Sequence, residues 1–278
     1  MSPLSHPHLP TTNIEGHEIA RFVVGSNWFL GYSHQTAARD KWLRRYQTVD
    51  NIVAVLKVCS AGGMNALVAV SDPRMTEAKR RHEEETGDHL TWFTTPGGAT
   101  TADLLRNIDG CAELGAEFCL PHVSWTDPRV HAATNTITDY EQVAAHIRGC
   151  GMIPGLSTHR PDTIVVGDRA GYDIATYIQP YNALGFLCSV ETDWVARVIN
   201  GTPKPIICIK PLGAGRINPL TGLSFVFSTV KPTDMVCIGL LCEEEAQEDL
   251  EIVQGLLAGE RVEPELQYTR SKATLMNR

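Results

Sequence analysis

Two histidines follow directly on apolar, strand-like runs of the chain. His122 ends the run EFCLPH, and His159 comes directly after the run MIPGLST. Imidazoles in such places can hold a substrate oxygen, move a proton or ligate a metal ion. The two runs are consecutive along the chain, and neighbouring strands of a sheet lie about 4.8 Å apart. We therefore predict that both side chains belong to one polar site and act in catalysis.

Lys210 has the corresponding place after a third apolar run, PIICI. An amine held there loses solvation, which lowers its pKa and suits it to acid–base or Schiff-base chemistry. The segment Gly213-Ala214-Gly215 that follows allows the backbone to approach a ligand closely. We predict that Lys210 is a catalytic residue, as a base or as an electrostatic clamp on the substrate.

A further histidine, His34, follows the first apolar run and could reach the same place. Three histidines with one open coordination position form a recognised catalytic metal centre. The sequence thus predicts a site for a divalent cation (zinc, manganese, iron or nickel) with His34, His122 and His159 as ligands. Each histidine also has a simpler interpretation, as a hydrogen-bonded structural residue at the end of a strand.

Small polar side chains stand at the ends of the same apolar runs. Such groups orient hydroxyl and carbonyl groups of a ligand by hydrogen bonding. A small, oxygen-rich substrate, such as a carbonyl compound or a sugar, fits this chemistry. The predicted substrate-binding residues are Asn27, Ser157, Gln179, Tyr181 and Asn182.

These residues need a framework that brings the ends of many strands together. Short β-rich runs alternate with amphipathic segments, several of which open on Thr and acids and close on Gly, which is typical of helix caps. Strand–helix alternation with strands apolar on both faces predicts a parallel sheet covered by helices. The strands are expected at residues 21–27, 66–70, 90–95, 117–123, 152–158, 175–181, 205–212 and 234–240.

Eight such repeats in 278 residues favour an α/β fold closed into a (β/α)8 TIM barrel. An open doubly wound sheet is the main alternative, but GSNWFLG after the first strand lacks the G-x-G-x-x-G spacing. Active sites of such barrels lie on the loops at the carboxyl ends of the strands, where the candidates above fall. We expect one domain over residues 1–278, with the barrel over about 17–258, polar tails at both ends, and a short hairpin with Gly16 at its turn.

The composition limits the partners. A formal net charge of −8 argues against nucleic acid or an anionic membrane, since both require clustered Lys and Arg. The N-terminus has no apolar signal-peptide core, and no apolar stretch reaches the roughly 20 residues of a membrane span. The eight cysteines include no C-x-x-C pair, and those in apolar runs are expected to be buried free thiols. We expect a cytoplasmic protein that acts on a small molecule and could form a homo-oligomer.

The second half of the chain, roughly residues 117–257, resembles the aldo-keto reductase superfamily. EFCLPHVSW resembles its fourth strand, which ends in the catalytic His, here His122. GLSTHRPDTI and IQPYNALG resemble its fifth and sixth strands, where a Ser-Asn pair and a Gln contact the nicotinamide. IKPLGAGRINPLTGLSFVFS and DMVCIGLLCEEEAQEDLEIV resemble its seventh and eighth strands. The resemblance implies the same barrel, with Ser157 and Gln179 beside a nicotinamide ring.

The first half departs from the pattern of that family, which has an Asp and a Tyr after the second strand and a Lys on the third. Here the second strand leads into VAVSDPRMTEA, with Asp72 but no tyrosine, and the third reads LTWFTTPGG. Thr158 replaces the Asn, and the acidic GLLCEEEAQED replaces the Lys and Arg that hold the 2′-phosphate of the cofactor. Because losing a general acid costs about 10²–10⁴-fold in rate, NAD(P)H-dependent reduction becomes the less expected activity.

Three functions remain. The favoured one is a non-redox lyase, isomerase or hydrolase whose metal ion polarises a carbonyl or activates water. The alternative is an NAD(P)H-dependent oxidoreductase of aldo-keto reductase type, with His122 as acid and Tyr32 or another donor in place of the missing tyrosine. The third is a barrel without catalysis, used to sense a ligand or as an interaction scaffold.

Overall fold

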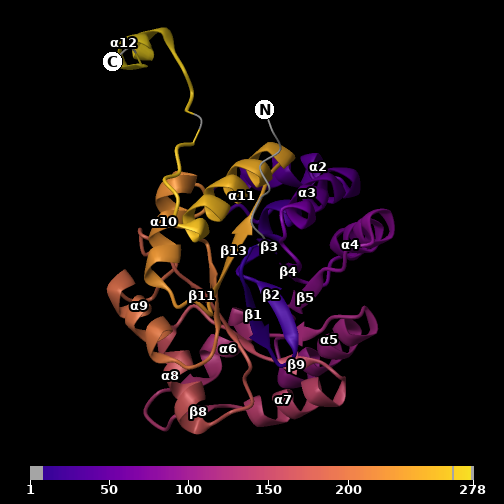
Figure 1. Cartoon of the computed structure of the whole chain (residues 1–278). Helices are drawn as coiled ribbons and strands as arrows, with labels where there is room; N and C mark the ends of the chain where they lie inside the picture. The colour runs from indigo at the N-terminus through magenta and orange to yellow at the C-terminus, as the bar shows by residue number, and fades with distance from the viewer. Residues whose placement is uncertain (1–8, 265, 277–278) are drawn as a thin grey trace.

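Parallel strands form a closed barrel surrounded by helices in the computed structural model of the chain, which describes residues 9–264 and 266–276 (Figure 1). Apart from β9 and β10, which are separated by a single residue, successive barrel strands are joined by segments that contain helices, so the chain repeats one strand–helix unit. The barrel strands are β3 (Phe22–Gly25), β4 (Ala66–Ala69), β5 (Thr91–Thr94), β6 (Phe118–Cys119), β9 (Ile153–Pro154), β10 (Leu156–Ser157), β11 (Tyr177–Pro180), β12 (Ile206–Ile209) and β13 (Met235–Gly239).

The barrel closes because its first and last strands pair with each other. β3 pairs in parallel with β13, with Val23 opposite Cys237, and with β4 on its other side. From there the order runs through β5 and β6 to β9 in one direction, and through β12 and β11 to β10 in the other. β9 and β10 are the two halves of one segment, separated by Gly155, so the ring of strands is completed there. The predicted (β/α)8 barrel is confirmed.

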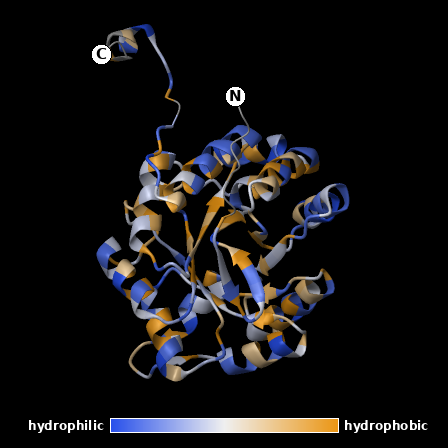
Figure 2. Cartoon of the chain, in the orientation of Figure 1, coloured by the Kyte–Doolittle hydropathy of each residue, from blue (hydrophilic) through white to orange (hydrophobic). Residues whose placement is uncertain are grey.

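The barrel strands are buried on both faces, because one face lines the interior and the other supports the helices. All four residues of β3 and of β11 are buried. The interior holds apolar side chains from successive strands, and the rings of Phe93 and Phe118 stack there at a centroid distance of 4.2 Å. Figure 2 shows the apolar strands at the centre and the mixed polarity of the helices around them. The interior is a packed core, so a ligand site has to lie at one end of it.

An antiparallel hairpin covers the amino-terminal end of the barrel. β1 (Thr11–Ile14) and β2 (His17–Ala20) pair across a turn in which Gly16 has a φ of +92°. Ile14 and Ile19 from this hairpin are buried in the same cluster as the barrel interior. The predicted hairpin with Gly16 at its turn is therefore confirmed, and the carboxyl ends of the strands remain as the open face.

The helices pack around the outside of the barrel, and several begin at the residues that the Thr-to-Gly pattern indicates. The hydroxyl groups of Thr48 and Thr100 accept backbone N–H groups at the starts of α3 and α5. A second hairpin, β7 (Val130–His131) with β8 (Thr136–Ile137), lies between α6 and α7. The helices are α1 (Asn27–Leu30), α2 (Ala37–Tyr46), α3 (Val49–Ala61), α4 (Pro73–Thr86), α5 (Thr101–Glu113), α6 (Val123–Thr126), α7 (Tyr140–Gly149), α8 (Pro161–Ala170), α9 (Thr192–Gly201), α10 (Pro219–Thr229), α11 (Glu243–Ala258) and α12 (Ala273–Met276), with 3-10 turns η1 (Asp127–Arg129) and η2 (Arg270–Lys272).

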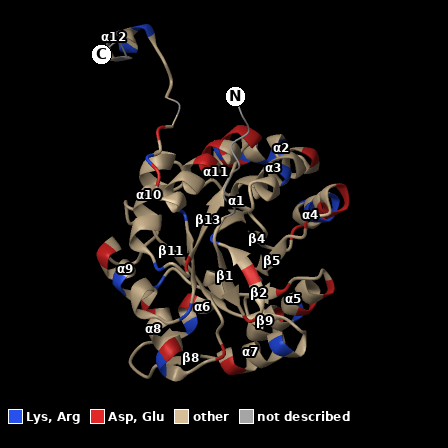
Figure 3. Cartoon of the chain, in the orientation of Figure 1, with Lys and Arg blue, Asp and Glu red and all other residues tan. Residues whose placement is uncertain are grey.

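Charged residues lie mainly on the outer helices, with Lys and Arg interspersed among Asp and Glu (Figure 3). Within the described ranges, no helix has the length and apolarity that crossing a membrane demands. The eight cysteines are free thiols, and five of them are buried. α12, near the carboxyl terminus, lies away from the barrel (Figure 1).

Candidate active site

A cavity of about 540 Å³ opens at the carboxyl ends of the barrel strands. Its deep part is lined by His122, His159 and Lys210, which follow β6, β10 and β12. Residues of the loop after β12 and of the first turns of α11 line it as well. The structure therefore brings the three predicted catalytic side chains to one space at the expected face.

His122 is held in one orientation by the short helix that follows it. It is the N-cap of α6, and its Nδ1 accepts the backbone N–H of Ser124 at 3.2 Å and lies 2.8 Å from the Ser124 hydroxyl. Because a backbone N–H can only donate, Nδ1 is an acceptor and the neutral ring carries its proton on Nε2. Burial, and then the positive charge of Lys210, lower the pKa of His122. His122 thus lines the cavity as a neutral hydrogen-bond donor.

His159 is also neutral, and the other groups that line the cavity contribute to this. Burial lowers the pKa of His159 to about 3, with further contributions from Lys210, His122 and His34. Its position is fixed through the backbone, since its N–H donates to the carboxylate of Asp127 at 3.2 Å. The ring can therefore accept or donate a hydrogen bond in the cavity, but it does not carry a charge near neutral pH.

Lys210 is the charged group of the deep cavity. It follows β12 with a φ of +62°, a left-handed conformation that costs energy for a residue with a Cβ and is common at functional sites. Within the described residues its ammonium group makes no hydrogen bond or ion pair with a carboxylate. Burial lowers the pKa of Lys210 to about 8. The amine is therefore mostly protonated at neutral pH and is able to release that proton.

His34 and Asn27 lie at the rim of the cavity rather than at its floor. Their side chains are exposed, and Asn27 Nδ2 is 3.3 Å from His34 Nε2. The backbone carbonyl of His34 accepts a hydrogen bond from Arg216, which also lines the cavity. This pair reaches the site from the first loop, as the sequence suggests, but it belongs to the entrance.

The three predicted metal ligands do not form a metal centre. In the part of the chain that the structure describes, the one group of three ligand residues with all ligand atoms within 4.8 Å lies elsewhere and contains none of them. The ammonium of Lys210 also stands among the imidazoles and lowers the pKa of each by its positive charge. A second cation in that space would be repelled, so the prediction of a metal ion on His34, His122 and His159 is wrong.

The other predicted polar residues divide into two groups. Ser157 is buried, lines the cavity and makes no side-chain hydrogen bond within the described residues. Gln179 is buried outside the cavity lining, and Tyr181 donates from its hydroxyl to Thr229 on α10. Asn182 closes its own turn by pairing with the backbone of Phe186. These last three residues do not line the cavity.

The outer end of the cavity holds groups that the search for strand-end residues missed. Glu245, Glu248 and Asp249, on the first turns of α11, line it. Asp249 is 4% exposed, and its Oδ1 has no hydrogen-bond partner in the described chain. Burial, with Glu245 and Glu248 nearby, raises the pKa of Asp249 to about 8. The acidic stretch EEEAQED is visible in the sequence, but the sequence does not tell which of its side chains face the cavity.

Comparisons with known proteins support the fold. No protein-family model matches the chain, and no curated protein does. An aldo-keto reductase structure from Pseudomonas aeruginosa matches at 16% identity and a TM-score of 0.65, covering 90% of this chain and 95% of the other. A glycerol dehydrogenase from Gluconobacter oxydans matches at 10% identity and a TM-score of 0.59, covering 93% and 99%. A Gox0644 variant in complex with NADPH matches at 12% identity and a TM-score of 0.57, covering 94% and 97%. The likeness shows that this chain has the barrel fold of these structures.

These findings correct two expectations. The favoured function, a metal-assisted lyase, isomerase or hydrolase, was wrong, because the structural neighbours are aldo-keto reductases. The expected divalent metal was wrong as well, since one neighbour holds NADPH and the histidines do not assemble a metal site. The alternative of an NAD(P)H-dependent oxidoreductase agrees better with the neighbours.

Proposed function

We propose that this chain, with its aldo-keto reductase fold, is a nicotinamide-dependent oxidoreductase that interconverts a small carbonyl compound and its alcohol. The observation that carries the proposal is the convergence of His122, His159 and Lys210 at the floor of one cavity on the carboxyl face of the barrel. Two neutral imidazoles and one amine able to release a proton suit a reaction in which negative charge develops on a carbonyl oxygen.

The residues of the cavity fit a dinucleotide. The hydroxyl of Ser157, which has no hydrogen-bond partner within the described residues, would bind the carboxamide of the nicotinamide. The loop after β12 has positive φ at Gly213, Ala214 and Gly215 and leads to the N-terminus of α10, where an anion is stabilised. Arg216 uses two of its donors on the backbone and keeps others for the pyrophosphate. When bound, the cofactor supplies the hydride or accepts it.

The outer wall favours a cofactor without a 2′-phosphate. Glu248 and Glu245 face the end of the cavity where a second phosphate would add about two negative charges. The buried Asp249 is held protonated at neutral pH, because its pKa is about 8. Its Oδ1, which has no partner in the described part of the chain, would accept a ribose hydroxyl. This acidic wall supports NAD(H) as the cofactor in place of NADP(H).

Lys210 takes the role of the proton donor in carbonyl reduction. Its ammonium would give a proton to the oxygen as hydride reaches the carbon, while the Nε2–H of His122 holds the same oxygen. The residues at two positions where the family has catalytic side chains make structural contacts here. Asp72 caps α4 through the N–H of Arg74, and Thr94 contacts the thiol of Cys111 behind the strand.

Cofactor binding tests the proposal directly. NADH titrated into the protein and followed by its fluorescence should bind with a Kd below about 1 mM. Arg216→Gln should weaken that binding by about 10-fold or more, since a charged hydrogen bond to phosphate is lost. Arg169→Gln on the outer face of α8 is the matched control and should leave it unchanged. Absence of binding by either NADH or NADPH would refute the proposal and favour a barrel that senses another ligand.

The pH dependence of the reaction follows from Lys210. Reduction requires its protonated form, which is present below the pKa of about 8 and lost above it. The logarithm of kcat for reduction should therefore fall with unit slope above pH 8, and kcat for alcohol oxidation should rise over the same range. The lowered pKa values of His122 and His159 place their titration below that range. Steady-state kinetics in both directions measures this. A kcat for reduction that does not change between about pH 7 and pH 10 would contradict it.

We further propose a cytoplasmic location, which the free thiols of all eight cysteines support.

A further inference from the structure

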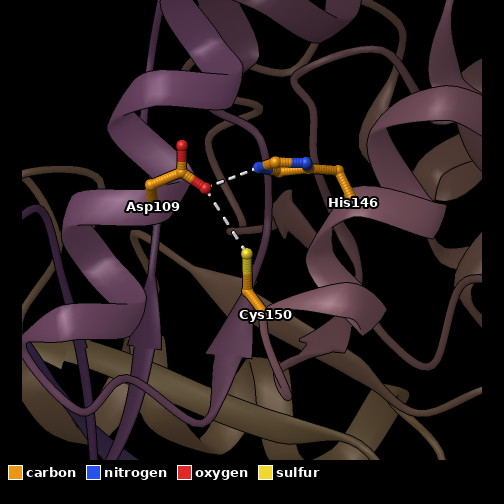
Figure 4. A group of neighbouring side chains, drawn as sticks. All are labelled: Asp109, His146 and Cys150. Carbon is orange, nitrogen blue, oxygen red and sulfur yellow. Dashed lines mark hydrogen bonds and ion pairs between the residues drawn. The ribbon is translucent and has the colours of Figure 1, made fainter.

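A second group of side chains with ligand chemistry lies on the outside of the barrel. Asp109 on α5 faces His146, near the end of α7, and Cys150, the residue that caps α7 (Figure 4). Their ligand atoms all lie within 4.8 Å of one another. Asp109 Oδ1 is 2.6 Å from His146 Nε2 and 3.5 Å from Cys150 Sγ. Carboxylate, imidazole and thiolate are the three ligand types that zinc prefers.

The backbone holds two of the three ligands in place. His146 and Cys150 are four residues apart, so they lie on the same face of the helix, and the N–H of Cys150 bonds to the carbonyl of His146 at 3.0 Å. Asp109 comes from the neighbouring helix. A cation bound here would therefore join α5 to α7, with ligands from both.

One of the ligand distances already matches a tetrahedral zinc site, and all three ligand atoms lie within 4.8 Å of one another. Zinc–ligand bonds of about 2.0–2.3 Å place sulfur and oxygen ligands about 3.6 Å apart, and nitrogen and oxygen ligands about 3.3 Å apart. The Cys150–Asp109 distance already matches the first value. The 2.6 Å between His146 and Asp109 would lengthen by a small rotation, which the exposure of the Asp109 side chain, 51%, permits. The remaining coordination position would be open to water.

The arrangement is not that of a reactive cysteine. A nucleophilic thiolate is stabilised by a neighbouring positive charge, whereas Cys150 Sγ lies against the carboxylate of Asp109. The imidazole of His146 bonds to that carboxylate and has no hydrogen bond to the sulfur in the described chain. A divalent cation offsets the negative charge of both groups, so ligation suits the cluster better than nucleophilic chemistry.

We propose that Asp109, His146 and Cys150 bind one zinc ion that joins α5 to α7. Cys150 stands three residues before β9, near the amino end of the barrel strands, whereas the cavity opens at their carboxyl ends. The ion is thus remote from the proposed cofactor site and stabilises the barrel without taking part in hydride transfer. This inference goes beyond the proposed function and does not depend on it.

Metal titration of the reduced full-length protein tests the proposal. Zinc, measured by competition with a chromogenic chelator, should bind at one equivalent, and Co²⁺ in its place should show a thiolate-to-metal absorption band. Cys150→Ser should abolish that band, and His146→Ala should weaken zinc binding by about 10-fold or more. Two variants serve as controls and should change neither result. His89→Ala removes another surface imidazole, which pairs with Glu83 and Glu117, and Cys242→Ser removes another thiol.

Two outcomes would overturn the zinc site. One is equal zinc affinity in the wild type and in Cys150→Ser and His146→Ala. The other is a cobalt spectrum of the wild type without the thiolate band. The thermal midpoint of each variant without metal shows that it is folded, and zinc should raise that midpoint in the wild type and the controls but not in Cys150→Ser.

Discussion

Lys210→Met should lower kcat for carbonyl reduction by about 10²–10⁴-fold, the range found when a general acid is removed. Methionine is similar to lysine in length and can be buried in the same place, and it also carries a Cβ at the φ of +62°. The change therefore removes mainly the proton and the charge. The Kd for NADH should stay within about threefold of the wild-type value, because Ser157 and Arg216 are untouched. Stopped-flow single-turnover rates, with NADH binding measured in parallel, separate the two effects.

Two further variants give that experiment its controls. Lys210→Arg keeps a positive charge but does not release its proton, so it should be nearly as slow as Lys210→Met. Lys204→Met removes a half-buried lysine on the outer side that pairs with Asp168, and it should keep the wild-type rate. A wild-type rate in Lys210→Met would show that another group supplies the proton, with the exposed Tyr32 at the rim as the next candidate.

The barrel could be predicted because each strand can be recognised from its own short run of residues. A run such as that of β12 is apolar on both faces, which a parallel strand between a core and a helix layer requires. The break of the fifth strand at Gly155 could not be predicted in this way. A Cβ at Gly155 would lie 2.6 Å from the carbonyl oxygen of Thr176, so the backbone there approaches its neighbour too closely for any other residue. At that residue the pairing changes from β6 to β11.

Site residues could be predicted where their place at the end of a strand decides their position. They could not be predicted where the face of the strand decides it. Side chains alternate between the two faces of a strand. Ile178 faces the barrel interior, so Gln179 faces the other way, and Tyr181 follows the same alternation into the helix layer. Counting that alternation from Ile178 would have separated these residues from Ser157, which does line the cavity.

The metal prediction failed for a different physical reason. The order of residues along the chain places His34, His122 and His159 at one face of the barrel, but it does not fix the distances between their nitrogens. Loop conformation decides that, and here His34 stays at the rim. The charge of Lys210 among them then decides against a second cation.

Glu248→Arg should shift the cofactor preference toward NADPH. Glu248 lines the outer end of the cavity, and its side chain is exposed, so a longer side chain is accommodated there. Glu245 is the poorer choice, because its carboxylate accepts the N–H of Leu241 before α11 and its loss would also affect the helix start. We expect the wild type to bind NADH more tightly than NADPH, and the variant to bind NADPH about 10- to 100-fold more tightly than the wild type does.

The effect on NADH provides the contrast that makes the charge argument specific. NADH lacks the 2′-phosphate, so its Kd should change by less than about threefold in Glu248→Arg. Glu251→Arg places the same charge one turn along α11, at a residue that does not line the cavity, and it should alter neither Kd. Salt should weaken the gain for NADPH, because the new contact is exposed. Equal gains for both cofactors, or a gain with Glu251→Arg, would mean that general attraction of an anion is at work, and the acidic wall would then lose its role in choosing between them.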